Sequence, residues 1–398
     1  MAETCDILIS GGGIAGLTAA AAFASSGFSV ICADPAPPVT DRDAEGSDLR
    51  TTAFLQPAQA LLARCGIWGR LEEHAAPLQV MRIVDAGGAR PEPRVIKDFN
   101  AADISDQPFG WNLPNWLLRR EMIARLAELP NADLRFGTGT TALFTRTDEA
   151  RVSLSDGSQV TAKLVVACDG RNSPMREAAG IPVKTTRYGQ KALAFAVTHP
   201  VPHENVSTEI HRSGGPFTLV PLPDYQGQPS SAIVWMERGP RAQELLNLEP
   251  ADFEAAMTER SCGLFGDLKL ASRRTIWPII SQSAERLNGE RLALMAEAAH
   301  VVPPIGAQGL NMSLGDLRSL LELAEARPEG LGDAQMLAAY HKARHNEILL
   351  RVKGIDLLNR TSMLAPRPLR DLRAFGLNAL YSLAPVRKTL MQMGLGVK

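Results

Sequence analysis

Short apolar segments followed by turns dominate the beginning of the chain. Residues 5–10 (CDILIS) lead into a glycine-rich turn and an alanine-rich stretch to about Ser26, and a second apolar segment, 28–33, ends at Asp34. Apolar runs of this length bounded by turn residues are typical of buried strands, and a longer alanine-rich stretch favours a helix. The chain is therefore predicted to open with a β-α-β unit.

Two later apolar segments repeat this arrangement. Residues 164–168 (LVVAC) lead into Asp169-Gly170, and residues 291–295 (RLALM) lead into AEAAH, a loop rich in proline and glycine, and a predicted helix from about Met312 to Ala326. Between them, residues 185–279 alternate between apolar and polar positions, which predicts an antiparallel sheet. The pattern therefore indicates an α/β protein with a second region rich in strands.

The turn after the first predicted strand has the spacing Gly11-x-Gly13-x-x-Gly16. Between a strand and a helix, these glycines allow a tight turn, close approach of the backbone to a pyrophosphate, and packing of helix on strand. Free N–H groups at the helix N-terminus can bind the phosphates, and Asp34 can accept hydrogen bonds from a ribose. The unit predicts dinucleotide binding. The Asp34 carboxylate disfavours the 2′-phosphate of NADP, so FAD and NAD remain.

Composition narrows the class of protein without choosing between these cofactors. Among 398 residues, 42 Lys and Arg oppose 43 Asp and Glu, so no nucleic-acid partner is expected. The five cysteines are scattered without a C-x-x-C pair, which predicts no metal site and a reducing, cytoplasmic location. The uncharged stretch 7–33 is rich in glycine and no Lys or Arg precedes it, unlike a signal peptide or membrane span.

Taken in order, these motifs resemble the FAD-dependent aromatic hydroxylases of the para-hydroxybenzoate hydroxylase type. The resemblance implies an α/β fold with a Rossmann-like FAD-binding domain of the glutathione reductase type, a β-sheet-rich substrate domain and a C-terminal helical tail. The last motif and the chain end are similar to ubiquinone-biosynthesis ring hydroxylases. The segments that carry the likeness are GGGIAG (11–16), DLRTTAF (48–54), DG-x-x-S-x-x-R (169–176), AAHVVPPIGAQGLN (298–311) and MGLG (393–396).

The implied domains are discontinuous in sequence. The FAD-binding domain is expected to comprise residues 1–78, 112–184 and 280–360, the substrate domain residues 79–111 and 185–279, and the helical tail residues 361–398.

The resemblance also implies which residues bind FAD. Ala296 and Glu297 depart from the family's Gly-Asp, Arg120 is an alternative to Arg119, and His300 is expected to form hydrogen bonds around the site or to act as a base. No catalytic residue is assigned. The residues implied for FAD are Gly11, Gly13, Ile14, Ala15, Gly16, Asp34, Arg50, Arg119, Asp169, Glu297, Pro304, Gly309, Leu310 and Asn311.

The implied reaction is hydroxylation of the aromatic ring of a polyprenyl-phenol in ubiquinone biosynthesis, by O₂ through reduced FAD and a C4a-hydroperoxide. The electrons come from NAD(P)H or another donor. No second nucleotide fingerprint is convincing, which leaves the direct donor open. The alternatives are hydroxylation of another small aromatic compound, an FAD-linked reductase or dehydrogenase, and a non-catalytic FAD-binding scaffold of a biosynthetic complex.

The end of the chain has a different charge balance. From Pro366 to Lys398 it carries six basic residues against Asp371 alone, with Leu369, Leu372, Phe375, Leu380 and Leu383 at near-helical spacing. This pattern predicts a helix docked on the FAD domain, or a basic amphipathic surface for a partner protein or the inner face of a membrane.

Overall fold

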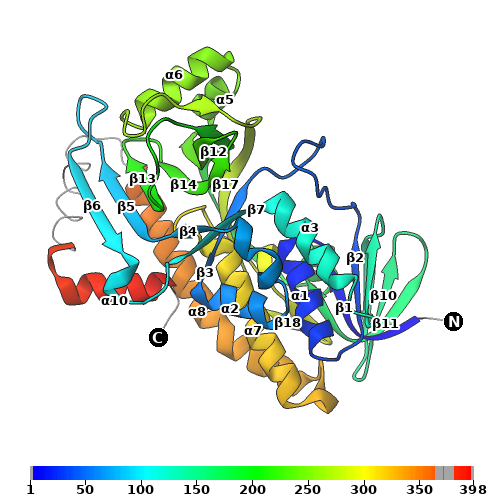
Figure 1. Cartoon of the computed structure of the whole chain (residues 1–398). Helices are drawn as coiled ribbons and strands as arrows, with labels where there is room; N and C mark the ends of the chain where they lie inside the picture. Colours follow the sequence, from blue (N-terminus) through cyan, green and yellow to red (C-terminus); the bar gives the residue numbers. More distant parts are fainter. Residues whose placement is uncertain (1–2, 364–370, 372–380, 396–398) are drawn as a thin grey trace.

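The computed structural model describes residues 3–363, Asp371 and 381–395, and its core is an eight-stranded sheet (Figure 1). Its strands are β1 (Glu3–Ser10), β2 (Val30–Asp34), β8 (Ala132–Phe136), β9 (Thr140–Thr145), β10 (Ala150–Leu154), β11 (Gln159–Ala167), β18 (Asn288–Gly289) and β19 (Leu292–Leu294). They run in the order β18-β19-β11-β1-β2-β8, with β10 and β9 joined through β11. The pairs between β19, β11, β1, β2 and β8 are all parallel.

Parallel strands are normally covered on both faces, so their sequences are apolar without alternation. Residues 7–9 of β1 and 164–167 of β11 are fully buried. Helix α1 (Ile14–Ser25) follows β1 directly, as the alanine-rich stretch predicts. The β-α-β unit and the two later strand–turn segments are thus present.

A nine-stranded sheet forms the second layer. It contains β5 (Val80–Asp85), β6 (Val95–Asn100), β12 (Val183–Thr198), β13 (Val206–His211), β14 (Pro216–Tyr225), β15 (Gln228–Arg238), β16 (Lys269–Leu270), β17 (Thr275–Ala284) and β20 (His300–Val301). All pairs are antiparallel except β5 with β13. Helices α5 (Gly239–Leu246) and α6 (Pro250–Arg260) pack on this sheet around Phe195, Trp235 and Phe253. Strand alternation predicted the sheet but not these helices.

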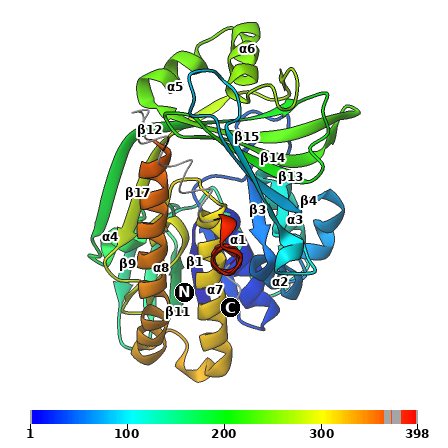
Figure 2. The ribbon, with the colours of Figure 1, turned by 90° about the vertical axis from the view of Figure 1, so that its left-hand side faces the viewer.

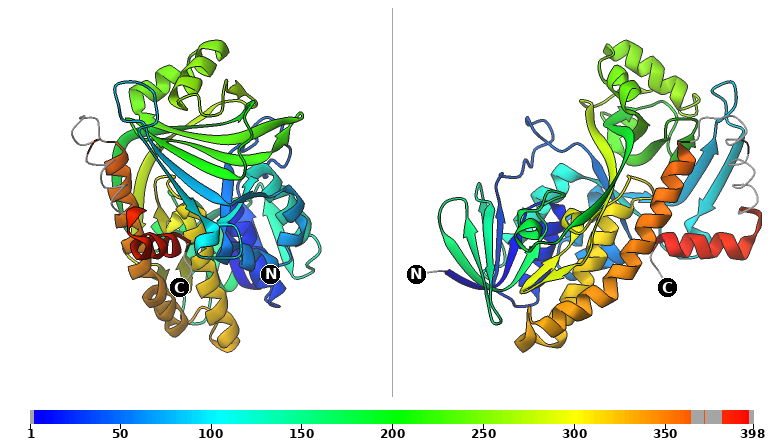
Figure 3. Two further views of the ribbon diagram at one scale, coloured as in Figure 1. Left: turned by 60° about the vertical axis from the view of Figure 1, so that its left-hand side comes forward. Right: turned by 180° about the vertical axis from the view of Figure 1, so that it is seen from behind.

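A small antiparallel sheet connects the two layers. It is formed by β3 (Thr51–Leu55), β7 (Gly110–Pro114) and β4 (Ala76–Leu78). The remaining α-helices are α2 (Gln56–Arg64), α3 (Asn115–Leu126), α4 (Pro174–Ala178), α7 (Gln308–Ala326), α8 (Ala334–Ser362) and α10 (Ala384–Leu395). Short 3₁₀ helices are η1 (Trp68–Arg70), η2 (Glu72–His74), η3 (Ala101–Asp103), η4 (Ala296–Ala298) and η5 (Pro328–Gly330). Figures 2 and 3 show α7 and α8 side by side, with α10 beside them.

The predicted fold class is confirmed, whereas some limits differ. Helix α7 begins at Gln308, about one turn before the predicted start at Met312. Of the apolar tail positions, Leu383 lies within the described residues and the other four lie outside them. No helix in the described part of the chain is long and apolar enough to cross a membrane. The predicted domain limits stay a prediction.

Candidate FAD site

The glycine-rich turn lies between β1 and α1, where the carboxyl ends of parallel strands meet. Gly11 has φ +101°, and a Cβ there would lie 2.5 Å from the carbonyl oxygen of Cys168. A Cβ at Gly16 would lie 1.9 Å from the carbonyl oxygen of Gly11, so the helix packs on the turn as closely as only glycine permits. Gly13 instead has no atom within 4 Å of such a Cβ. The turn therefore leaves open space at Gly13, in front of the α1 N-terminus.

Asp34 ends β2 directly beside this turn. Its Oδ2 accepts a hydrogen bond of 2.6 Å from the N–H of Gly12, and Oδ1 accepts one of 2.9 Å from Ala36. No side chain caps the first turn of α1, where Ile14 and Ala15 lie. Uncapped N–H groups and the positive end of the helix dipole favour an anion. This edge of the sheet therefore has the donors and the space that a pyrophosphate requires.

Asp169 follows β11 at the same edge. Its Oδ2 accepts hydrogen bonds from the Ser10 hydroxyl, at 3.0 Å, and from the N–H of Met175, at 3.2 Å. Its Oδ1 is buried without a well-formed hydrogen bond to any described residue. Burial raises the pKa of this carboxyl above its usual range. The side chain of Ser173 partly offsets this effect, so the Asp169 carboxyl is held within the turn by Ser10, Ser173 and Met175.

Arg50 and Arg119 meet at Asp48, which the sequence analysis did not single out. The Nε and one terminal nitrogen of Arg50 each lie 2.8 Å from the Asp48 carboxylate, and Arg119 lies 3.5 Å from it. Burial opposes ionisation of Asp48, but the hydrogen bonds from Arg50 outweigh it, so the pKa of Asp48 is held below its usual range. The negative charge of Glu297 also acts on Arg50. The structure thus brings Arg50 and Arg119 together at Asp48, with Glu297 near enough to act electrostatically on Arg50.

Two aromatic side chains accompany this arginine pair. The guanidinium of Arg50 lies 5.5 Å from the ring centroid of Trp277, and that of Arg120, the alternative to Arg119, lies 5.4 Å from that of Trp116. Arg50 keeps 47% of its side chain exposed. The exposed part of Arg50 can therefore contact a ligand while Asp48 holds the guanidinium in place.

The departure at 296–297 has a visible backbone consequence. Ala296 has φ +55°, in the left-handed region that favours glycine, and it is buried. Glu297 is exposed on η4 and its carboxylate acts on Arg50. The alanine therefore strains the turn without preventing it, and the acid still faces the arginine side of the site.

The loop after β20 leads into α7 with an open N-terminus. Ala307, the residue before the helix, has φ +55° and no side chain caps the first turn. Pro304 and Gly309 are exposed and Leu310 is half-buried; a Cβ at Gly309 would have its nearest neighbour 3.9 Å away. Backbone N–H groups of α7 are consequently accessible.

Asn311 fastens this helix end to β3. Its Oδ1 accepts a 2.9 Å hydrogen bond from the N–H of Leu55, and its Nδ2 donates to the carbonyls of Ala53 and Ala307. The side chain of Asn311 is therefore fully used within the protein. Contact with a flavin edge is left to the backbone at 309–311.

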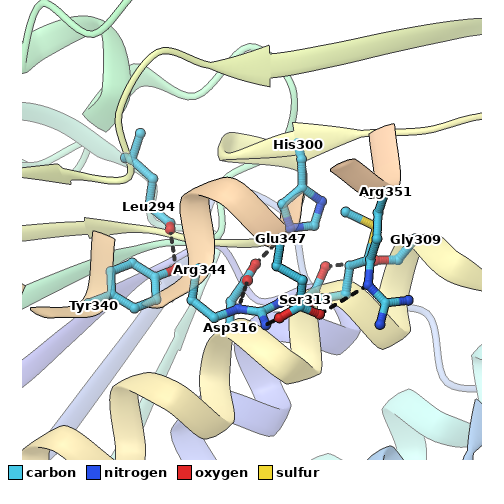
Figure 4. Close-up of polar contacts among 10 residues, drawn as sticks. Leu294, His300, Gly309, Ser313, Asp316, Tyr340, Arg344, Glu347 and Arg351 are labelled. Carbon is cyan, nitrogen blue, oxygen red and sulfur yellow. Dashed lines mark hydrogen bonds and ion pairs between the residues drawn. The ribbon is translucent and has the colours of Figure 1, made fainter. Parts of the chain in front are cut away.

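A buried polar network supports the same helix end (Figure 4). The Nε2 of His300 lies 2.6 Å from Asp316 Oδ2 on α7, and Asp316 Oδ1 accepts a 2.9 Å hydrogen bond from Arg344 on α8. Arg344 pairs with Glu347, and Arg351 joins Glu347 to the side chain of Gln308. His300 and Asp316 are fully buried. The structure gives His300 a hydrogen-bonding position in the core.

Two polar residues of β12 lie against α8. The Tyr188 hydroxyl donates a 2.6 Å hydrogen bond to Asp356, and Gln190 accepts one of 2.9 Å from Asn359. Among the described residues no group of His, Cys, Asp and Glu could hold a metal ion.

Open helix N-termini at α1 and α7, the Asp34 carboxylate beside the glycine-rich turn and an arginine pair are together what a dinucleotide-binding protein requires. Comparison with known proteins identifies it further: residues 4–350 match the model of the FAD binding domain family, and the chain belongs to this family of FAD-dependent monooxygenases. Its cofactor is FAD.

Individual relatives agree with this assignment. The chain is 34% identical to "Ubiquinone hydroxylase UbiL" of Rhodospirillum rubrum, over 99% of this chain and 90% of that protein. It is 26% identical to the 3-demethoxyubiquinol 3-hydroxylase of Escherichia coli, over 99% of both chains. The solved structure of p-nitrophenol 4-monooxygenase PnpA from Pseudomonas putida superposes with a TM-score of 0.79 at 18% identity, covering 100% of this chain and 99% of that one. This last likeness concerns the fold.

Proposed function

We propose that this monooxygenase hydroxylates the aromatic ring of a polyprenyl-phenol in ubiquinone biosynthesis, using O₂ and either NAD(P)H or another external reductant. The observation that carries the proposal is the match along almost the whole chain to a ubiquinone hydroxylase. The second observation in its favour is the open, positively polarised N-terminus of α7, which Asn311 holds against β3.

FAD, when bound, supplies electron transfer from the reductant and activation of O₂. The chain's first contribution is binding. The α1 N-terminus and the open space at Gly13 would receive the pyrophosphate, Asp34 would accept from the ribose, and Arg50 would add positive charge. Asp169 offers Oδ1 as a further acceptor. These are the proposed roles of the residues implied for FAD.

The second contribution is electrostatic. The N-terminus of α7 carries about half a positive charge, which would stabilise negative charge on a flavin ring bound in front of it. Glycine at 309 keeps this backbone accessible, and Asn311 fixes the helix end relative to β3. The helix therefore does not need to reorient during the reaction, which is the main advantage of such a preorganised charge.

The proposal includes contact with a membrane and with other biosynthetic proteins. A polyprenyl chain dissolves in the bilayer, and the end of the chain is basic and rich in leucine. The C-terminal segment is the proposed point of contact.

The test is product formation by the purified, FAD-loaded protein. It is incubated with reductant, catalase and ¹⁸O₂, with either a prenylated phenol or a small phenol such as 4-nitrophenol, and products are identified by mass spectrometry. We expect one ¹⁸O atom in the ring of the prenylated phenol and little product from the small one. Free reduced FAD with catalase is the control for non-enzymatic oxidation.

Preferential turnover of the small phenol would contradict the proposed substrate class. Product that forms equally well without O₂ would contradict hydroxylation and favour a dehydrogenase. Bound flavin that is reduced and reoxidised without any organic product would favour the scaffold.

A further inference from the structure

Helix α10 has two apolar sides, and only one of them is covered. Its inner side contributes Met391, which is 7% exposed, and Met391 is the sole buried side chain among the α10 residues that the structure describes. Leu383 lies immediately before the helix. Its carbonyl accepts a hydrogen bond from the backbone N–H of Arg387, one turn later. The outer face, defined here as Leu383, Val386, Leu390 and Met393, is 38–59% exposed.

The spacing of the outer face is helical. Positions 383, 386, 390 and 393 repeat at three and four residues, so they form one stripe along α10. The leucine, valine and methionine side chains of this stripe form an exposed apolar patch, roughly several hundred Å² in area. Its contact with water is removed only when another apolar surface covers it. Nothing among the described residues covers this stripe.

The inner side closes an apolar cluster next to the flavin side of the molecule. We call this the β3–α10 cluster; its buried members are Leu55, Leu78, Ala101, Phe109 and Met391. Leu55 donates its backbone N–H to Asn311, which also bonds to the first turn of α7. The cluster thus begins at Leu55, which is hydrogen-bonded to the first turn of α7, and ends at Met391 of α10.

Few polar contacts hold α10 in place. Gln308 donates a 3.1 Å hydrogen bond to the carbonyl of Gly394, and Arg387 lies 3.5 Å from Asp103. Just before the helix, the Tyr381 hydroxyl donates to the carbonyl of Asp98. In Figure 1 and in the right-hand view of Figure 3, α10 extends away from α8 toward β6. The Tyr381 ring also packs edge-on against Phe99, with centroids 5.4 Å apart. An element held by one buried side chain, three polar anchors and this ring pair opens at lower cost in free energy than the core of a sheet.

The charges near α10 favour an anionic surface. Asp98 and Asp103, the acids closest to these anchors, pair with Arg82 at 2.7 Å and with Arg387. Lys388 is exposed and forms no ion pair with the residues described in the structure. The helix itself carries Arg387 and Lys388 and no acid. Acidic lipid headgroups are therefore the complementary partner.

From these observations we propose that α10 is a cover operated by the membrane. The outer face enters an anionic bilayer, Met391 leaves the β3–α10 cluster, and the polyprenyl chain of the substrate takes its place, which carries the ring toward the α7 N-terminus. The inference rests on the proposed function for the identity of the substrate. The membrane contact and the opening of the cluster do not depend on it.

The test uses full-length, FAD-loaded protein and the double variant Val386→Ser/Leu390→Ser, whose side chains contact solvent. Phe144→Ser is the matched control, because Phe144 on β9 is 55% exposed in the other sheet. Flotation with vesicles containing phosphatidylglycerol is expected to recover the native protein and the control, and about tenfold less of the double variant. Equal flotation of all three proteins would overturn the contact.

Turnover separates the cover from simple adhesion. A long-chain prenyl phenol in these vesicles is expected to react about tenfold more slowly with the double variant, whereas a soluble phenol with one isoprene unit reacts equally with both. Equal loss on both substrates would show a structural defect and overturn the proposal. Hydrogen exchange in residues 76–81 and 99–109 is expected to become faster with vesicles, and unchanged exchange there would overturn the opening of the cluster.

Failure of the proposed function would look different. In that case neither phenol reacts, but flotation and hydrogen exchange still respond to Val386→Ser/Leu390→Ser. Self-association through the outer face would instead appear as a dimer in size-exclusion chromatography that the double variant abolishes, and would overturn the lipid as occupant.

Discussion

At the scale of single residues, Ala296 shows how a departure from a family pattern can be kept at a cost. Its φ of +55° is one that a side chain with Cβ adopts with strain, whereas glycine adopts it freely. Glu297 follows on the exposed side and still acts on Arg50. The substitution of the usual Gly-Asp thus affects backbone energy more than the chemistry of the site.

Ala296→Gly is therefore expected to stabilise the protein by about 0.5–1 kcal/mol, because removal of the strain outweighs the added freedom of the unfolded chain. Urea unfolding monitored by tryptophan fluorescence measures this difference. The control is Ala298→Gly in the same short helix, where φ is not positive and about 1 kcal/mol is lost. A lower stability of Ala296→Gly would contradict the strain.

Asp169 predicts a pH dependence. Burial raises its pKa in the folded protein, so the folded state binds the proton more tightly than the unfolded chain, and stability falls as pH rises above about 4 through the raised pKa. Asp169→Asn removes this loss and flattens the fall of the urea midpoint of the apoprotein. Asp156→Asn is the opposite control, since hydrogen bonds from Ser158 lower the pKa of Asp156. An unchanged pH profile of Asp169→Asn would refute this assignment.

At the scale of elements, α7 depends on the buried network that joins it to β20 and α8. Asp316 is fully buried between His300 and Arg344, and its charge has no access to water. The arrangement holds three elements at fixed distances just behind the open helix end. Its loss would therefore affect folding before it affected chemistry.

Asp316→Asn is expected to cost about 3–5 kcal/mol, because it removes the fully buried counter-charge of Arg344 and leaves that buried guanidinium with Glu347 alone, which is 43% exposed. Thermal and urea unfolding measure the loss. Glu322→Gln on the same helix is the matched control, since its pair with Arg318 is exposed and contributes at most about 1 kcal/mol. A similar small effect of both variants would mean that the network is not charged as described.

The same elements show what sequence can and cannot predict. The β1-α1-β2 unit was predictable because turn glycines and apolar runs act locally. The first turn of α7 was not, because Gly309 and Asn311 are poor helix formers and tertiary bonds from Asn311 to β3 and from Gln308 to Arg351 hold them helical. The role of Asp48 was not predictable either, since only folding brings α3 and its Arg119 beside it.

At the scale of the whole molecule, the candidate FAD site is assembled from parts of the chain that are far apart in sequence. In the first sheet, the turn at 11–16 follows β1, Asp169 follows β11 and the loop at 296–311 follows β19. Arg50 lies directly before β3 of the small sheet between the layers. A ligand that contacts all of them stabilises the fold as a unit.

Removal of FAD is expected to lower the thermal midpoint by several degrees, since a ligand at a hundredfold its Kd stabilises by about 2.7 kcal/mol. Differential scanning fluorimetry of apoprotein with FAD, ADP or riboflavin checks this. ADP and riboflavin each contact half of the site and are expected to shift the midpoint less than FAD. Equal shifts with FAD and ADP would contradict an extended site.

Strand β12 sets the mechanical character of the whole. Its 16 residues span about 50 Å. It pairs with β17 along one edge and with β15 along the other, so it is a long, rigid strand that runs through the second layer. The pairing with β17 is interrupted between Arg187 and Lys191, where Gly189 has φ +68°. Hydrogen bonds that Tyr188 and Gln190 form with α8 hold this irregular segment in place. The irregular segment of β12 is thus held rigid by α8. Motion that admits a large substrate therefore has to come from elements with fewer contacts to this strand.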